Sequence, residues 1–254
     1  MSDARVMKVA TWNVNGIRAR HAQLVEWTAQ EQPDVLCLQE IKASPAQIPD
    51  PLTTLADYWS FWHGGPKGYS GVSLHLRKAT FPEAPKFTHP SFDHECRVVE
   101  AVAGGIRWAS LYVPNGGKDY AAKIAFLREL EKWTRANASE KLVLCGDLNV
   151  ALTDRDVHAK ELKPGGIGQR ADERELLGRV IGNGLVDVTR ALHPDDADFF
   201  TWWAPWRQLR ERNIGWRIDF VLMSELLAKN ARSAEIRRQV GTSDHGPLVV
   251  TFDL

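Results

Sequence analysis

The sequence predicts an α/β protein in which mixed β-sheets are covered by helices. Short apolar, β-branched runs recur along the chain, two longer segments have the apolar spacing of helices, and strand pairs occur both early and late without a regular alternation. No linker, repeat or low-complexity stretch interrupts the 254 residues, of which 44% are hydrophobic. We therefore expect residues 1–254 to form one domain with a sizeable core.

The first half of the chain reads as strands around one helix. Val6–Ala10 is a short strand, and His21–Gln30 has helical spacing. Val35–Leu38 is apolar at every position, as in a strand buried on both faces, and Ser44–Pro51 is a loop or a single turn. Gly, Pro and charge clusters separate four further expected strands: Tyr58–Trp62, Gly71–Leu76, Val98–Val102 and Ile106–Val113.

The second half contains the two clearest helices. Tyr120–Arg135 has an apolar stripe opposite a charged face, and Ala171–Ile181 ends at two nearby glycines. Lys141–Cys145 is a strand between them. Trp216–Met223 and Leu248–Phe252 are expected as closing strands.

Composition excludes several classes of protein. Lys plus Arg and Asp plus Glu both number 32, so a polyanion must be held by a local basic patch and a histone-like role is disfavoured. The 3 cysteines form no CxxC pair, and no apolar run approaches the roughly 20 residues of a membrane span. The start of the chain does not resemble a signal peptide. We expect a cytoplasmic protein without membrane contact, nucleoid-associated if the source is bacterial.

Carboxylate and amide side chains lie at or beside the expected strands. Asn13, Glu40, Asp147 and Asn149 follow strands, Asp219 lies within the strand expected at Trp216–Met223, and Asp244–His245 comes just before the final strand. One polar residue after a strand is usually turn chemistry, whereas a set beside buried strands indicates a site. Such oxygens suit Mg²⁺, with Mn²⁺ as the expected substitute. The sequence has no P-loop, no GxSxG and no zinc-type spacing, so a metal-assisted hydrolase of phosphate esters fits best.

Aromatic and basic residues are interleaved between Phe200 and Arg217. The segment holds Trp202, Trp203, Trp206 and Trp216 together with Arg207, Arg210, Arg212 and Arg217. This pattern is typical of a surface that follows a nucleic-acid backbone. The alternative is the edge of a Trp-rich core with a solvated Arg face.

Six ordered motifs resemble those of the exonuclease III-like apurinic/apyrimidinic endonucleases, within the endonuclease/exonuclease/phosphatase superfamily. The motifs are Thr11–Arg18, Leu38–Lys42, Tyr112–Gly116, Gly146–Val150, Gly215–Asp219 and Ser243–Pro247. The resemblance extends over Lys8–Leu254. It implies a four-layer sandwich of two mixed sheets packed face to face, with helices on the outer faces and the site at one rim. The segment Gly165–Arg174 departs from the family by lacking its usual Phe and Pro.

The resemblance also implies roles for single residues. Glu40 resembles the main metal-binding carboxylate, with Asn13 and Asp244 beside it. Asp147 resembles the group that orients or deprotonates the attacking water, or protonates the leaving oxygen. His245, oriented by Asp219, resembles the group that polarises the phosphate. The expected catalytic set is Tyr112, Asp147, Asn149, Asp219 and His245, and the expected metal set is Asn13, Glu40, Asp147, Asn149, Asp244 and His245.

The implied activity is Mg²⁺-dependent cleavage on the 5′ side of abasic sites in duplex DNA, with 3′→5′ exonuclease or 3′-end trimming. The partner would be double-stranded DNA with abasic sites or blocked 3′ ends, bound by a monomer. Trp202, Trp216 and Ile218 resemble a pocket for the abasic sugar. The expected DNA contacts are Arg18, Lys42, Lys67, Tyr69, Asn115, Lys118 and Arg217.

Two alternatives use the same scaffold. A catalytically dead nucleic-acid-binding regulator should have lost metal or phosphate residues, whereas Glu40, Asp147 and His245 are all present. A phosphatase of lipids or inositol phosphates would not need the Trp/Arg segment, which favours DNA.

Overall fold

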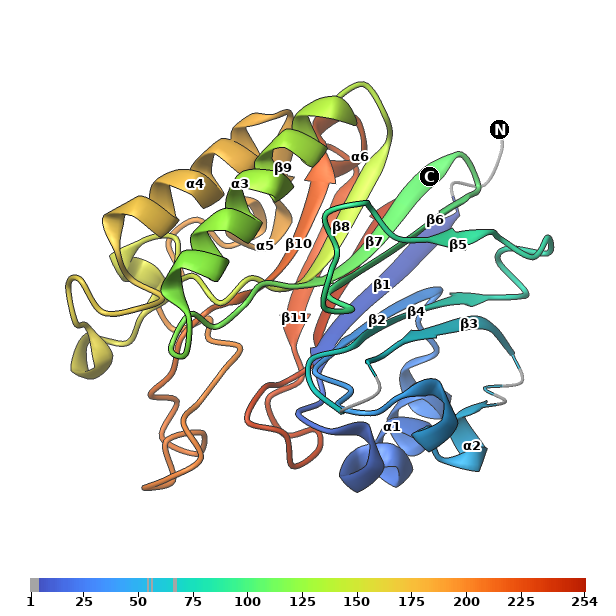
Figure 1. The fold of residues 1–254 in the computed structure, drawn as a ribbon, viewed down its shortest axis with the longest axis horizontal. Coiled ribbons are helices and arrows are strands. Elements are labelled where there is room, and N and C mark those ends of the chain that lie inside the picture. Colours follow the sequence, from blue (N-terminus) through green and yellow to red (C-terminus); the bar gives the residue numbers. More distant parts are fainter. Residues whose placement is uncertain (1–4, 54, 56, 66–67) are drawn as a thin grey trace.

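Two six-stranded sheets pack face to face in the computed structural model, which describes residues 5–53, 55, 57–65 and 68–254 (Figure 1). The first sheet has the order β11-β12-β1-β2-β4-β3. Its strands β1 and β2 are parallel and its other neighbours are antiparallel. The bounds are β1 Val6–Asn13, β2 Val35–Gln39, β3 Tyr58–His63, β4 Val72–Arg77, β11 Ala231–Ile236 and β12 Leu248–Asp253.

The second sheet has the order β5-β6-β7-β8-β10-β9 and is also mixed. Strands β7 and β8 are parallel, and their neighbours run antiparallel to them. The bounds are β5 Phe87–Thr88, β6 Val98–Ala103, β7 Ile106–Tyr112, β8 Leu142–Asp147, β9 Leu185–Asp187 and β10 Asp219–Ser224. Each sheet therefore has one parallel pair, and a helix joins the two strands of that pair.

Helices cover the outer faces of both sheets, as Figure 1 shows. Helices α1 and α2 lie on the first sheet, and α3 and α4 lie side by side on the second. Asp119 caps α3 by accepting a 2.9 Å hydrogen bond from the amide of Ala122. The bounds are α1 Ile17–Glu31, α2 Asp50–Thr53, α3 Tyr120–Ala136, α4 Ala171–Gly182, α5 Val188–Leu192 and α6 Glu225–Ala228.

Three apolar layers result from this arrangement. The central layer lies between the sheets, a second lies under α3 and α4, and a third lies under α1. Both faces of strand β2 are buried, which explains why Val35–Leu38 is apolar at every position. Val35 and Cys37 belong to the central layer, whereas Leu36 and Leu38 face α1. The expected four-layer sandwich is confirmed.

Some predicted boundaries were wrong. The strand predicted at Trp216–Met223 begins at Asp219, because residues 216–218 form only isolated bridges and loop contacts. Strands β5, β9 and β11 were not predicted. The first two have 2 and 3 residues, and β11 is an edge strand with polar residues and a register shift. Among the described residues, no helix is long and apolar enough to cross a lipid bilayer.

Candidate active site

The two parallel pairs bring their carboxyl ends to the same rim of the sandwich. Asn13 pairs with Gln39 at the ends of β1 and β2, and Tyr112 pairs with Asp147 at the ends of β7 and β8. Asp219 lies opposite Asp147 in the neighbouring antiparallel strand. Side chains that are more than 200 residues apart in sequence can therefore meet at this rim.

Asn13 connects the two sheets. Its side-chain Nδ2 donates to Glu40 Oε1 at 2.9 Å and to Asp147 Oδ2 at 2.8 Å, and its side-chain Oδ1 accepts from the backbone amide of Asn15. Asn13 is fully buried. The amide therefore holds two carboxylates from different sheets at a fixed separation.

Glu40 follows β2 in a left-handed conformation with φ 48°. Its second oxygen lies 2.7 Å from Lys42 Nζ. Burial alone would raise the pKa of Glu40, but the hydrogen bonds from Lys42 and Asn13 outweigh burial and lower it. Glu40 is therefore an anion at neutral pH.

His245 lies between two carboxylates. Its Nδ1 is 2.8 Å from Asp219 Oδ2, and its Nε2 is 3.8 Å from Asp147 Oδ2. Burial alone would lower the pKa of His245, but the charges of Asp219 and Asp147 raise it. The imidazolium form is stabilised, and Asp219 fixes the ring so that Nε2 faces Asp147.

Burial raises the pKa of Asp147 well above its usual range. The positive charge of His245 opposes this shift, whereas the charges of Asp219 and Glu40 add to it. A carboxyl group with a raised pKa beside an imidazolium can take up or release a proton near neutral pH.

Asn149 occupies the turn after β8 with φ 52°. Its amide N–H donates to Asp147 Oδ1 at 2.9 Å, its side chain donates to the carbonyl of Val113, and its Oδ1 accepts from Asn115. The backbone carbonyl of Asn149 accepts a 2.7 Å hydrogen bond from Lys123, which the sequence interpretation did not include.

Tyr112 ends β7 with its side chain almost completely buried. Burial and the charges of Glu40 and Asp147 raise the pKa of Tyr112, so its hydroxyl stays protonated, and it donates a hydrogen bond to Glu40.

Asp244 and Trp202 connect the catalytic residues to an apolar wall. The indole of Trp202 donates to Asp244 Oδ2 at 2.9 Å, and Asn15 donates to Oδ1 at 2.8 Å. Trp202 packs edge-on against Trp216, with ring centroids 5.5 Å apart, and both pack against the small apolar cluster that contains Ile218. The predicted pocket residues are thus adjacent.

Polar and apolar residues line one cavity of about 260 Å³. Its lining combines the acidic rim with the aromatic wall: Glu40, Asn115, Asp147, Asn149, Ile167, Gly168, Trp202, Trp216, Ile218, Asp244 and His245. Ile167 and Gly168 come from the segment that departs from the family motif. Gly168 has φ 88°, and a Cβ there would lie 2.7 Å from the Trp216 ring, so only glycine fits.

The rim has the donor set of a hard divalent cation. Asp147, Asp219 and His245 each offer a ligand atom, and these atoms lie within 4.8 Å of one another. Asp219 Oδ1 is buried without a hydrogen-bond partner, while Glu40 and Asp244 add two more carboxylates at the cavity wall. These residues fit Mg²⁺ or Mn²⁺.

The expected DNA contacts differ in their exposure to solvent. Arg18, Tyr69, Asn115 and Lys118 are exposed, and Lys42 is partly exposed although it is paired with Glu40. Lys67 lies outside the described residues. Arg217 differs from all of these residues.

The prediction that Arg217 contacts DNA was wrong. Its side chain is fully buried and forms 2.7 Å ion pairs with Asp156 and Asp187. A guanidinium enclosed in this way cannot reach a phosphate, and it instead anchors the segment before β10. Within the same Trp/Arg segment Trp203 is also buried, whereas Trp206 is exposed.

The sequence pattern of the Endonuclease/Exonuclease/phosphatase family matches residues 10–245. The chain belongs to this family. This confirms the predicted relationship and enzyme class, a nuclease hydrolase.

Individual relatives agree with this assignment. Exodeoxyribonuclease of Bacillus subtilis is 30% identical over 98% of this chain and 100% of its own length. DNA repair nuclease APEX1 of Danio rerio is 31% identical over 96% of this chain and 81% of its own. Recombination repair protein 1 of Drosophila melanogaster is 31% identical, and the match spans 37% of that longer protein.

Solved structures share the fold over 98% of the chain. An AP endonuclease from Archaeoglobus fulgidus superimposes with a TM-score of 0.86 at 30% identity, covering 100% of that chain. The 3′ phosphatase NExo from Neisseria, bound to a product DNA hairpin, superimposes with a TM-score of 0.88 at 30% identity, also covering 100% of that chain.

Proposed function

We propose that the protein is a Mg²⁺-dependent DNA repair nuclease that hydrolyses the phosphodiester bond on the 5′ side of abasic sites in duplex DNA. Mn²⁺ is the expected substitute for Mg²⁺. The observation that carries the proposal is one cavity whose lining includes both Trp202, Trp216 and Ile218 and Asp147, Asn149 and His245. A binding surface for a baseless sugar and groups suited to phosphoryl chemistry thus share one space.

The reacting phosphate would lie between Asn149 and His245. In the reaction, a water oxygen bonds to phosphorus and the bond from phosphorus to the 3′ oxygen of the preceding nucleotide breaks. The preceding nucleotide is left with a 3′ hydroxyl, and the abasic sugar keeps the 5′ phosphate. Asp147 either takes the proton from water or gives one to the leaving oxygen, since its carboxyl group lies beside the His245 imidazolium. His245 donates a hydrogen bond toward the phosphate, whose negative charge increases in the transition state. Asn149 and Tyr112 would add donors by exchanging their present hydrogen bonds to Asp147 and Glu40 for the phosphate.

A divalent cation, when bound, would neutralise further phosphate charge. Glu40, Asp147 and Asp244, with Asn13, Asn149 and His245 around them, are the residues that would hold it. Their carboxylate oxygens make Mg²⁺ preferable to softer cations.

Substrate choice follows from the apolar wall. An abasic nucleotide has no base to unstack, so moving it out of the duplex costs less than flipping a paired nucleotide, for which the cost is a few kcal/mol. Trp202 and Trp216 then contact the sugar and leave little room for an intact base.

Removal of nucleotides or blocking groups from 3′ ends is the second activity we propose for the same site. The Neisseria 3′ phosphatase supports it, because that protein has the same fold and was solved with a product DNA hairpin. We expect the protein to act on double-stranded DNA as a monomer in the cytoplasm, near the nucleoid if it is bacterial.

The direct test is incubation with an end-labelled duplex that carries one abasic analogue, with Mg²⁺ or with chelator. One product whose length places the cut immediately 5′ of the analogue supports the proposal, provided that chelator abolishes it. A ladder starting at the 3′ end would make end trimming the main activity. No cleavage of either kind in the presence of Mg²⁺ would overturn both proposals.

A further inference from the structure

A second titratable cluster lies outside the candidate active site. His63 ends β3, His89 follows β5, and Asp93 lies in the loop before β6. Each offers one ligand atom, and these atoms lie within 4.8 Å of one another. None of the three lines the cavity of about 260 Å³ that contains Asp147 and His245.

The cluster is already partly organised. His63 Nε2 lies 2.7 Å from Asp93 Oδ2, and the rings of His63 and His89 stack with centroids 4.7 Å apart and planes 21° apart. The amides of Arg97 and Val98 donate to the Asp93 carboxylate at 2.8 and 3.2 Å. Such backbone hydrogen bonds orient a ligating carboxylate, as outer contacts do in known metal sites.

We infer that His63, His89 and Asp93 form a binding site for a divalent transition-metal ion of the Zn²⁺ type. Two imidazoles and one carboxylate suit Zn²⁺ and its neighbours, whereas Mg²⁺ prefers oxygen ligands. A cation there replaces the His63–Asp93 hydrogen bond with two metal–ligand bonds. Three protein ligands leave a fourth position for water.

The required movement is small. Ligand atoms held about 2.0–2.1 Å from a tetrahedral ion lie roughly 3.3–3.4 Å from one another. His63 Nε2 and Asp93 Oδ2 are 2.7 Å apart and must separate by about 0.6–0.7 Å, whereas no separation within the cluster exceeds 4.8 Å, so His89 must approach by at most about 1.5 Å. His89 is exposed and can make this movement by side-chain rotation, while the more buried His63 and Asp93 move less.

The ion would join the two segments that flank it. One segment follows His63 and contains Tyr69, and the other leads from Asp93 to Arg97. Arg97 already donates to the Tyr69 hydroxyl at 2.9 Å, and its guanidinium lies 5.3 Å from the centre of the Tyr69 ring and 4.9 Å from that of Tyr112. A cation bound by the cluster would therefore add a second connection between these segments, beside the hydrogen bond from Arg97 to Tyr69.

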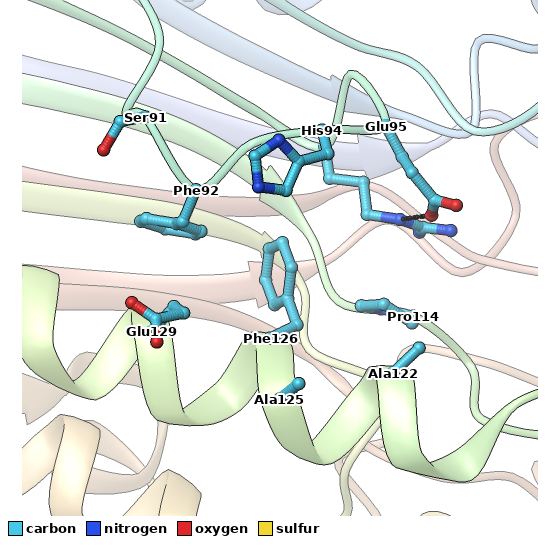
Figure 2. Close-up of a pocket in the computed structure, with 10 residues that line it drawn as sticks. Ser91, Phe92, His94, Glu95, Pro114, Ala122, Ala125, Phe126 and Glu129 are labelled. Atoms are coloured by element: carbon cyan, nitrogen blue, oxygen red, sulfur yellow. Dashed lines mark hydrogen bonds and ion pairs between the residues drawn. The ribbon is translucent and has the colours of Figure 1, made fainter.

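The neighbouring His94 provides a matched control. It lies on the same exposed loop, beside Asp93, but is not a member of the cluster. Figure 2 shows its ring above Phe126, at the edge of a cavity of about 600 Å³ between this loop and α3. Replacing His94 changes a loop histidine without removing a ligand.

The test is isothermal titration of metal-free protein with Zn²⁺ in excess Mg²⁺. Because the rim cluster of Asp147, Asp219 and His245 could also take Zn²⁺, a His245→Ala background is titrated in parallel. We expect about one equivalent bound by the wild type, by His94→Ala and by His245→Ala. His89→Ala should bind at least about tenfold more weakly, as expected when a group that supports a metal site is lost.

Thermal unfolding gives an independent readout. Zn²⁺ should raise the Tm of wild type and His94→Ala but not that of His89→Ala, because a ligand that binds only the folded state stabilises it. Equal isotherms for wild type and His89→Ala would overturn the inference. So would loss of binding in His245→Ala, which would place Zn²⁺ at the rim. Absence of binding to the wild type would leave His63 and Asp93 as a hydrogen-bonded pair only.

Discussion

We expect Lys123 to hold in place the turn after β8 that carries Asp147 and Asn149. It lies on α3 with its side chain fully buried, and its Nζ is 2.5 Å from Glu173 Oε2 on α4. The same ammonium donates to the backbone carbonyl of Asn149 at 2.7 Å, and Asn149 has φ 52°. Burial lowers the pKa of Lys123 while Glu173 opposes this shift. One buried ion pair thus connects two outer helices to the turn that carries Asp147 and Asn149.

The variant Lys123→Met leaves the Glu173 carboxylate buried without its counter-charge. Removing one partner of a buried pair costs about 3–5 kcal/mol. For a protein of this size about 1 kcal/mol corresponds to roughly 2–4 °C, so Tm should fall by about 6–20 °C. Turnover should fall as well, because the Asn149 carbonyl loses its donor.

A double variant separates these two effects. Lys123→Met with Glu173→Gln removes both charges, and replacing a buried pair by neutral groups is often close to neutral for stability. The introduced glutamine side chain would keep an oxygen for the amide of Arg170, which now donates to Glu173 Oε1 at 2.9 Å. We expect Tm to recover most of its loss while kcat on an abasic duplex stays low.

The assay compares kcat, KM and Tm for wild type, single variant and double variant at saturating Mg²⁺. A double variant with recovered Tm and wild-type kcat would show that Lys123 only stabilises the fold. An unchanged Tm for Lys123→Met would show that the Glu173 carboxylate is not buried away from water as the structure indicates.

Four further predictions concern the rim. Asp147→Asn should lower kcat by about 10²–10⁴-fold, the usual contribution of a proton-transfer group, while gel-shift affinity for DNA is retained; equal kcat would remove Asp147 from the chemistry. Glu40→Ala should raise the Mg²⁺ concentration for half-maximal rate, since a hard cation loses an anionic ligand; overlapping Mg²⁺ titrations would move the metal site toward Asp244. Trp216→Ala should lower the ratio of abasic cleavage to end trimming; an unchanged ratio with a much lower Tm would make Trp216 a core residue only. In chelator, stability should fall as pH rises from the ordinary pKa of each group, 3.8 for Asp147 and 6.5 for His245, to its raised pKa in the folded state, because over that range the folded protein keeps a proton that the unfolded chain has lost. Asp219→Asn should move the upper end of the His245 part to lower pH, and a superimposable profile of Tm against pH would refute the role assigned to Asp219.

Several elements could be predicted from sequence because their signal is local. Val35–Gln39 is apolar at each of its first four positions, and Tyr120–Ala136 has a clear apolar stripe, so strand and helix were identified within a few residues. Asn13, Glu40 and Asp147 were identified because each ends or follows a buried strand. The resemblance of six motifs added the roles of these residues and the sandwich arrangement.

Lys123 illustrates a local signal that the sequence interpretation did not use. It precedes Leu127 and Leu130 by four and seven residues, so it lies on the buried stripe of its helix. A charge at such a position predicts a buried partner. Which partner it has could not be predicted, because Glu173 is fifty residues away on another helix.

For other side chains, only the tertiary structure decided which residues they contact and whether they are buried. Arg217 has the same sequence context as a DNA-contacting arginine, yet it is enclosed by Asp156 and Asp187, which lie 61 and 30 residues earlier in the chain. Ile167 and Gly168 line the cavity although their segment lacks the family motif. His63 meets Asp93 only because β3 and the loop before β6 lie at the same end of the two sheets. Local sequence determines which segments become strands and helices, through the spacing of apolar residues. The neighbours of a side chain depend instead on how distant segments pack. That packing decides which charges are buried as pairs and which remain free to bind a ligand.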